Sequence, residues 1–351
     1  QYQLDLFPES RDEFSSTLIT NFNRAKIAWY IIDPIFYGTT NRPKNINKED
    51  LSLPYVRRVR INEVFPDKEL SSGAEATYLS ILNLAFYPQE RGPYNFDAKP
   101  VSAISAGVNQ DGSLKLPESR WGGIMRKINN TDFEASNVEY IEFWVMDPFI
   151  GKNGQDGNPK HSGGKLYFNL GDVSEDVLRD GRKAFENGMP TTATVVDVDT
   201  TQWGRVPKLQ AIVNSFDNNP ASRKYQDIGL NGLNDEDERA FYKKFLKDMS
   251  EVLGGQNSTA YKKIEKDPAS DDYVYFRRGL WDTVSSSANK IEDRYKFFNN
   301  PQGNSPSSND NPESAYTTQQ TNYPNTEDIS GDNTLSEAEN YYQYEVNLDP
   351  D

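Results

Sequence analysis

The sequence lacks cysteine altogether and contains one histidine, His161, among its 351 residues. Disulfide bonds, catalytic thiolates and cysteine-bound zinc are therefore excluded, as are metal sites built from several histidines. No context for a serine nucleophile and no phosphate-binding GxxxxGK[ST] loop is found. We therefore expect no enzyme. The sequence contains too many Asp and Glu residues to single out the pair of carboxylates that a glycosidase would need. A glycan-cleaving enzyme therefore stays as a weaker alternative.

Long apolar runs and positive charge are scarce as well. No stretch of about 18 consecutive apolar residues is present, so the sequence predicts no transmembrane helix. The chain carries 38 Lys and Arg against 53 Asp and Glu, a net charge of −15, and residues 301–351 hold ten acidic residues and no Lys or Arg. Because phosphate contacts need cationic side chains, we expect no nucleic-acid partner. Acidic loops suit hard divalent cations better.

Aromatic residues, glycine and proline are abundant, with 20 Tyr, 18 Phe, 23 Gly and 20 Pro. This composition favours strands and long turns over a helical bundle. Strands are predicted at 25–32, 55–61, 78–86, 138–149, 163–173 and 192–199, and "YYQYEVNL" (341–348) could complete a sheet begun earlier. Apolar residues alternate with polar ones in 138–149 and 163–173, which predicts an antiparallel, jelly-roll-like β-sandwich.

One segment has a helical pattern. In "NDEDERAFYKKFLKDMSEVLGG", Phe241, Phe245, Met249 and Val252 recur at helical spacing. Asn234 or Asp235 could cap its start, and the two glycines 254–255 end it. We predict a mainly β protein with some helix and long loops, divided into a strand-rich segment 1–91, a sandwich module 92–215, a calcium-loop-like and helical segment 216–298, a flexible linker or surface loop 299–325, and a calcium-loop-like motif with a closing strand, 326–351.

A candidate calcium loop lies near the C-terminal end, in "DISGDNTLSEAE". The acidic, hydroxyl and carbonyl positions fit a twelve-residue EF-hand loop, with Leu335 as its apolar anchor. It is similar to the calcium loop of dockerin-type modules. The alternative is an acidic turn that caps a short helix at Ser336. The predicted ligands are Asp328, Ser330, Asp332, the carbonyl of Thr334, and Glu339.

A second loop of the same length, "DIGLNGLNDEDE", directly precedes the predicted helix. Gly229 removes the ligand expected at its third position, so a plain capped helix is an equal alternative. Neither loop adjoins a recognisable nucleophile or base, and any Ca²⁺ is therefore expected to be structural. The second-choice ligands are Asp227, Asn231, Asp235 and Glu238.

Four aromatic residues suggest an alternative function. Trp121, Tyr140, Trp144 and Trp203 could form a sugar-stacking platform on the sandwich. Aromatic residues in strands pack more often in a core or across strands. A calcium-dependent carbohydrate-binding or adhesive surface module is therefore the second hypothesis.

Long colinear blocks resemble one known family. These blocks are "NRAKIAWYIIDPIFY", "YPQERGPYNFD", "RWGGIMRKINNTDFEASNVEYIEFWVMDPF", "GGKLYFNLGDVSEDVLRDGRKAFENGMP", "VNSFDNNPASRKYQDIGLNGLNDEDE" and "NTEDISGDNTLSEAENYYQYEVNL". They run in order from about residue 23 to residue 348 and resemble the SprA/Sov family. Its members are very large outer-membrane translocons of type IX secretion in Bacteroidetes, tied to gliding motility.

The resemblance implies that the chain is an internal fragment of a much longer, barrel-forming protein. Few segments carry the alternation of lipid-facing barrel strands. We therefore expect a soluble cap or insertion domain of the translocon, on the extracellular face of the outer membrane, that helps shape or gate the passage of secreted proteins. Its implied partners are other type IX secretion subunits and cargo proteins. Membrane association would come only through the parent barrel, and no catalytic residue is implied.

Overall fold

The computed structural model describes residues 18–69, 78–101, 103–130, 132–149, 163–176, 182, 198–208, 231–284, 290–298, 329–330, 332 and 335–348. The strands are β1 (Lys26–Tyr30), β2 (Asn83–Tyr87), β3 (Lys165–Asp172), β4 (Val198–Thr200), β5 (Arg205–Pro207) and β6 (Asn340–Asn347). The helices are α1 (Ile61–Val64), α3 (Asp235–Phe241), α4 (Lys243–Val252), α5 (Thr259–Lys266) and α6 (Lys290–Lys296). Short 3₁₀ turns are Leu18–Asn21, Pro34–Tyr37, Asp50–Ser52, Pro117–Ser119 and Gly279–Thr283.

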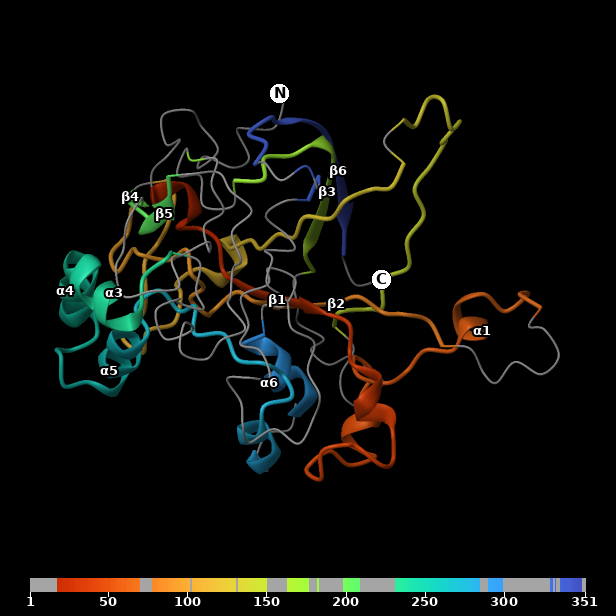
Figure 1. Ribbon diagram of the computed structural model, residues 1–351, viewed down its shortest axis with the longest axis horizontal. Coiled ribbons are helices and arrows are strands. Elements are labelled where there is room, and N and C mark those ends of the chain that lie inside the picture. The colour runs from red at the N-terminus through yellow and green to blue at the C-terminus, as the bar shows by residue number, and fades with distance from the viewer. Residues whose placement is uncertain are drawn as a thin grey trace.

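β1 and β2 form an antiparallel pair at the centre of the molecule, with Lys26 opposite Tyr87 and Tyr30 opposite Asn83 (Figure 1). These strands confirm the predictions for 25–32 and 78–86. Alternate residues of β1 are buried, and α6 packs against the strand. The ring of Tyr30 stacks on that of Tyr295, with 4.1 Å between centroids.

β3 and β6 pair antiparallel over eight residues, from Lys165 opposite Asn347 to Asp172 opposite Asn340. The pair confirms both predicted strands, and it confirms that the last strand completes a sheet begun much earlier in the chain. Lys165 and Glu345 form an ion pair across it at 2.7 Å. The third pair, β4 with β5, includes the end of the predicted strand 192–199, of which residues 192–197 lie outside the described part.

The described residues make a mixed α/β structure with three two-stranded antiparallel sheets and five helices. The jelly-roll-like sandwich is therefore not confirmed. Two predicted strands are wrong. Residues 55–61 form a turn that leads into α1, and residues 138–149 contain no strand. An alternating pattern makes a strand only when a partner supplies hydrogen bonds, and none does so for 138–149 within the described ranges.

The predicted helix is present as two helices, α3 and α4, that meet at Tyr242. Its side chain is buried and donates a hydrogen bond to the carbonyl of Trp203, and its backbone leaves the helical region. The predicted cap is confirmed, because Asn234 Oδ1 accepts hydrogen bonds from the amides of Glu236 and Asp237 at 3.1 and 3.0 Å. In Figure 1, α3, α4 and α5 gather on one side of the molecule.

The apolar core consists of two clusters. The first packs α4 and α5 against loops from the first half of the chain, and the second packs α6 against β1 and the turns that follow it. Each cluster contains residues from more than one of the predicted segments. The boundaries between these segments stay predictions. The first contains Phe22, Ala25, Tyr94, Phe96, Ala98, Ile104, Val108, Leu114, Trp203, Leu233, Tyr242, Phe245, Leu246, Met249, Leu253, Tyr261, Ile264 and Ala269. The second contains Ala28, Tyr30, Ile32, Phe36, Ile46, Val56, Tyr275, Phe276, Ile291, Tyr295 and Phe298.

Buried polar side chains bind the irregular backbone between these elements. Asn95 is fully buried, its amide donates to the carbonyls of Phe22 and Arg24 at 3.0 and 2.7 Å, and its Oδ1 accepts from the amide of Gly92 at 2.9 Å. The guanidinium of Arg91 donates to the carbonyl of Asn95. These bonds satisfy backbone groups that no strand or helix pairs. In the described ranges, no helix is both long and apolar enough to cross a membrane.

We expect Asn95→Ala to lower the free energy of unfolding by about 3 kcal/mol, because the carbonyl of Arg24 and the amide of Gly92 lose their bonds to Asn95. The carbonyl of Phe22 also loses its bond to Asn95 and keeps its bond from Arg120. Urea unfolding followed by circular dichroism measures the change.

The matched control is Asn109→Ala. The side-chain amide of Asn109 donates to the hydroxyl of Ser113 at the surface, and we expect the loss of this bond to cost about 0.5 kcal/mol or less. Equal losses in the two variants would contradict the role given to Asn95.

Candidate functional site

Five carboxylates converge where α3 begins and α5 ends. Asp235 and Glu238 lie in the first turns of α3, Asp267 follows the last residue of α5, and Asp271 and Asp272 come from the next loop. Asp267 joins two groups of three. Ligand oxygens of Asp235, Asp267 and Asp272 lie within 4.8 Å of one another, and so do those of Glu238, Asp267 and Asp271. Both groups could hold a metal ion.

Glu238 and Arg91 hold the segment from Asp267 to Ala269 in place. Glu238 is 1% exposed, and its carboxylate accepts hydrogen bonds from the side-chain amide of Asn231 at 2.6 Å and the backbone amide of Ala269 at 3.0 Å. Arg91 donates from Nη2 to the carbonyl of Pro268 at 2.8 Å. The chain from Asp267 to Ala269 is therefore fixed on both sides, which positions the acidic side chains that flank it.

The close approach of like charges changes the acidity of the cluster. Burial, then the charges of Asp267 and Asp235, raise the pKa of Asp272 to about 6. Burial is also the first cause of the raised pKa of Asp235, with Asp267 next. The pKa of Glu238 lies above its usual value, chiefly because the side chain is buried. Oxygen ligands crowded in this way are the kind that hard divalent cations such as Ca²⁺ bind, and a bound cation would remove the repulsion.

The second predicted calcium loop contributes two residues to this cluster, Asp235 and Glu238. Asn231 braces the cluster through its bond to Glu238, and its Oδ1 accepts from the amide of Leu233 at 2.8 Å. Asp227 lies outside the described residues. The loop pattern missed Asp267, Asp271 and Asp272, because the ligands come from two segments. The run "KDPASDD" directly after a helix is the signal that could have indicated them.

The first predicted calcium loop has a different neighbour, Glu175. Its buried carboxylate accepts hydrogen bonds from the backbone amides of Ser330 and Ser336 at 2.7 and 2.8 Å, and its own amide donates to the carbonyl of Ser336 at 2.7 Å. Leu335 is 3% exposed, as expected of the apolar anchor. Of the predicted ligands, Ser330, Asp332 and Glu339 are described, whereas Asp328 and Thr334 are not, and calcium binding here stays a prediction.

The segment 138–147 exposes a run of large apolar side chains. The exposed fraction is 75% for Tyr140 and 63% for Trp144, and Val138, Ile141, Phe143, Val145 and Met146 are exposed as well. The segment touches the rest of the molecule through rings: Trp144 meets Phe65 at 5.7 Å and Phe143 meets Phe168 of β3 at 4.6 Å. Several adjacent exposed apolar residues are typical of a surface that meets another protein.

The aromatic residues predicted as a sugar platform do not share one environment. Trp203 is 1% exposed and packs against Phe96 in the first core cluster, so it cannot offer a face to a sugar. Tyr140 and Trp144 are exposed on the segment 138–147, and Trp121 is half-buried beside Arg24. The structure therefore gives no support to a platform of these four residues.

Comparison with known protein families gives a match for the last part of the chain. Residues 244–351 match the family model SprA_N, described as a motility related/secretion protein. The SprA/Sov resemblance is confirmed. The matched region contains α4, α5, α6 and β6, together with Asp267, Asp271 and Asp272 of the acidic cluster. No curated protein matches the chain. The match indicates a protein related to secretion and motility, and the exposed segment 138–147 lies outside the matched residues.

We expect Asp272→Asn to raise the free energy of unfolding by about 1 kcal/mol at pH 7.5 in EDTA. The folded protein holds the proton of Asp272 more tightly than the unfolded chain does. Wild-type stability from this group therefore falls as the pH rises from the usual pKa of 3.8 to about 6, and it stays low above that range. Asparagine does not titrate, so the free energy of unfolding of the variant lacks the decrease with pH that Asp272 causes in the wild type.

Urea unfolding at pH 4 and pH 7.5 measures both effects. Glu139→Gln serves as the control, because Glu139 is exposed and the same change of charge there should leave stability within about 0.5 kcal/mol. A variant at Asp272 that is less stable than wild type at pH 7.5 would show that the carboxylate makes a favourable contact instead.

Proposed function

We propose that this chain is a non-enzymatic domain of the outer-membrane translocon of type IX secretion. It forms a cap or insertion on the extracellular face, helps shape or gate the passage of secreted proteins, and supports gliding motility. The observation that carries the proposal is the match of residues 244–351 to a motility and secretion family. The net charge of −15 and the polar, aromatic-rich surface loops agree with a domain that lies in water beside partner proteins.

The exposed segment 138–147 supports a role in assembly. The segment forms neither helix nor strand, the rings of Phe143 and Trp144 anchor it, and most of its apolar side chains are open to solvent. A segment whose backbone is not paired within its own protein can pair with a strand of another protein and place alternate side chains in pockets. We therefore assign the contact with other secretion subunits or cargo to this segment.

We further propose that a calcium ion braces the acidic cluster. The support is the convergence of Asp235, Asp267 and Asp272 from two helix ends. An ion there would tie the start of α3 to the end of α5. The affinity expected for three carboxylates is on the order of 10⁻⁴ M. At about 1 mM free Ca²⁺ the gain in stability would be about 1.4 kcal/mol by mass action.

The assembly role is tested in the full-length parent protein with Tyr140→Ser and Trp144→Ser combined. We expect export of a reporter cargo to fall at least tenfold while the amount of translocon stays normal on immunoblots. Glu142→Gln changes a neighbouring residue of the same segment and should leave export unchanged. Normal export by the double variant would remove segment 138–147 from the mechanism.

The calcium site is tested by calorimetric titration of the chain. Wild type should bind Ca²⁺ with a Kd on the order of 10⁻⁴ M, and Asp267→Asn should weaken binding at least tenfold because both groups of carboxylates use Asp267. Glu236→Gln, an exposed residue of the same helix, is the matched control. Heat that survives in Asp267→Asn but is lost in Asp332→Asn would place the ion in the loop 328–339 instead.

A further inference from the structure

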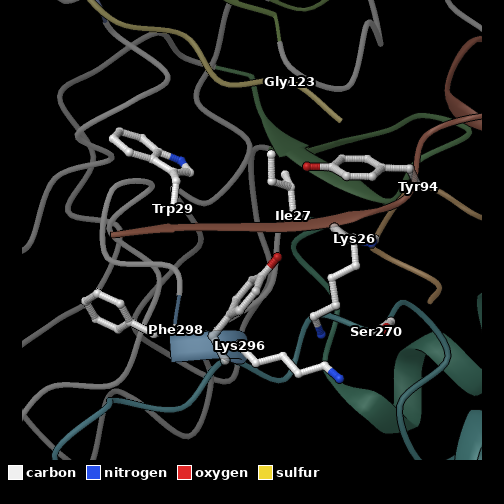
Figure 2. Close-up of a pocket in the computed structure, with 10 residues that line it drawn as sticks. Lys26, Ile27, Trp29, Tyr94, Gly123, Ser270, Lys296 and Phe298 are labelled. Carbon is white, nitrogen blue, oxygen red and sulfur yellow. The ribbon is translucent and has the colours of Figure 1, made fainter. Parts of the chain in front are cut away.

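A small cavity of about 30 Å³ lies beside β1, between α6 and the loop that follows α5 (Figure 2). Its lining carries two lysines, Lys26 and Lys296, and three hydroxyl groups, those of Tyr94, Ser270 and Tyr273. The remaining wall is apolar, apart from the exposed Gly123. A space of this size holds a water molecule, a small ion or the end group of a chain, and it cannot enclose a whole sugar, nucleotide or peptide.

Lys26 is the unusual member of this lining. It occupies a buried position of β1, with 7% of its surface exposed, in line with the inward-facing Ala28 and Tyr30. Among the described residues its ammonium has no hydrogen-bond acceptor and no carboxylate within ion-pair distance. Its Nζ lies 4.2 Å from the centre of the ring of Phe297. Because the side chain is buried and no acceptor in the described part of the chain is within reach, the N–H donors of its ammonium depend on what occupies the cavity.

The second lysine increases the positive charge at the cavity. Lys296 reaches to the same side of β1 as Lys26 (Figure 2), and it forms an ion pair with Glu90. Three ammonium groups, those of Lys26, Lys263 and Lys296, thus lie near two carboxylates, those of Glu90 and Asp267, which leaves one positive charge in excess. Burial lowers the pKa of Lys26 to about 8, the charges of Glu90 and Asp267 oppose the change, and that of Lys296 adds to it. Lys26 therefore still carries most of its positive charge at pH 7.

The chemistry of the lining defines the ligand that fits. The surplus charge calls for one negative charge, and the volume admits only a few atoms. The ammonium groups and the tyrosine hydroxyls are hydrogen-bond donors, whereas the hydroxyl of Ser270 already donates to the carbonyl of Arg91 at 3.3 Å. We propose that this cavity binds one small carboxylate ion, held by the ammonium of Lys26 with Lys296 beside it. The same group could arrive as a free ion or as the carboxylate at the end of a peptide chain, and the experiment separates these sources.

The test is thermal unfolding of the whole chain at pH 7, with sodium formate replacing sodium gluconate at constant ionic strength. Gluconate carries the same charge, but its carboxylate is attached to a hydroxyl-bearing carbon that is too wide to enter the cavity, unlike the CH₂ that carries the carboxylate of a glycine peptide. We expect formate to raise the Tm saturably, by about 2 °C at ten times its Kd. Lys26→Met should abolish the rise, whereas Lys244→Met, an exposed lysine of α4, should keep it.

A chemical readout keeps the test valid if Lys26→Met fails to fold. Reductive methylation of Lys26 in the wild-type protein, measured by peptide mass spectrometry, should slow at least threefold in formate and not in gluconate.

Tetraglycine decides the source: a rise in Tm with tetraglycine indicates a chain-end carboxylate, and a rise with formate alone indicates the free ion. Equal Tm and equal methylation in formate and gluconate, or a formate effect that persists in Lys26→Met, would overturn the proposal.

Discussion

The described structure depends on polar side chains that bind backbone carbonyls inside the protein. The sheets in the described ranges have two strands each, so backbone groups outside the helices and paired strands need other partners. Arg120 shows how this need is met: its guanidinium donates to the carbonyls of Phe22, Lys115 and Gly107 at 2.7, 3.1 and 3.3 Å. Together with Asn95 and Arg91 it joins the start of the chain to loops about a hundred residues later. Apolar packing alone would leave these carbonyls buried without a bond.

The same interactions place the candidate sites. The loop after α5 carries three acidic residues on one side and Ser270 and Tyr273 of the cavity on the other. Arg91 and Glu238 fix this loop through backbone bonds at Pro268 and Ala269. A change in either buried side chain would therefore disturb both the acidic cluster and the cavity, and the control variants proposed above lie away from them.

The sequence allowed a correct prediction wherever the signal was local. Alternation located β3, a strand-like apolar run located β1, and an aromatic run located β6. The Asn234 cap and helical spacing located α3 and α4. The strand at 138–149 failed because alternation does not reveal whether a partner strand exists. The acidic cluster was found only in part, since Asp235 belongs to a loop-like motif whereas Asp267 comes close only through the packing of α5 on α4. The sequence pattern also gave no sign of Lys26, because a single lysine in an apolar strand is normally exposed at an edge.

The proposed calcium site and the proposed carboxylate-binding cavity are coupled through the charge of Asp267. Asp267 belongs to both carboxylate groups, and its negative charge also stabilises the charged form of Lys26. A cation at the cluster would neutralise Asp267, which makes a second positive charge at Lys26 less favourable unless an anion accompanies it. An occupied cluster therefore favours an anion in the cavity, and linkage requires that the anion strengthen cation binding by the same factor. The loop from Asp267 to Tyr273 would be most rigid when both ions are present.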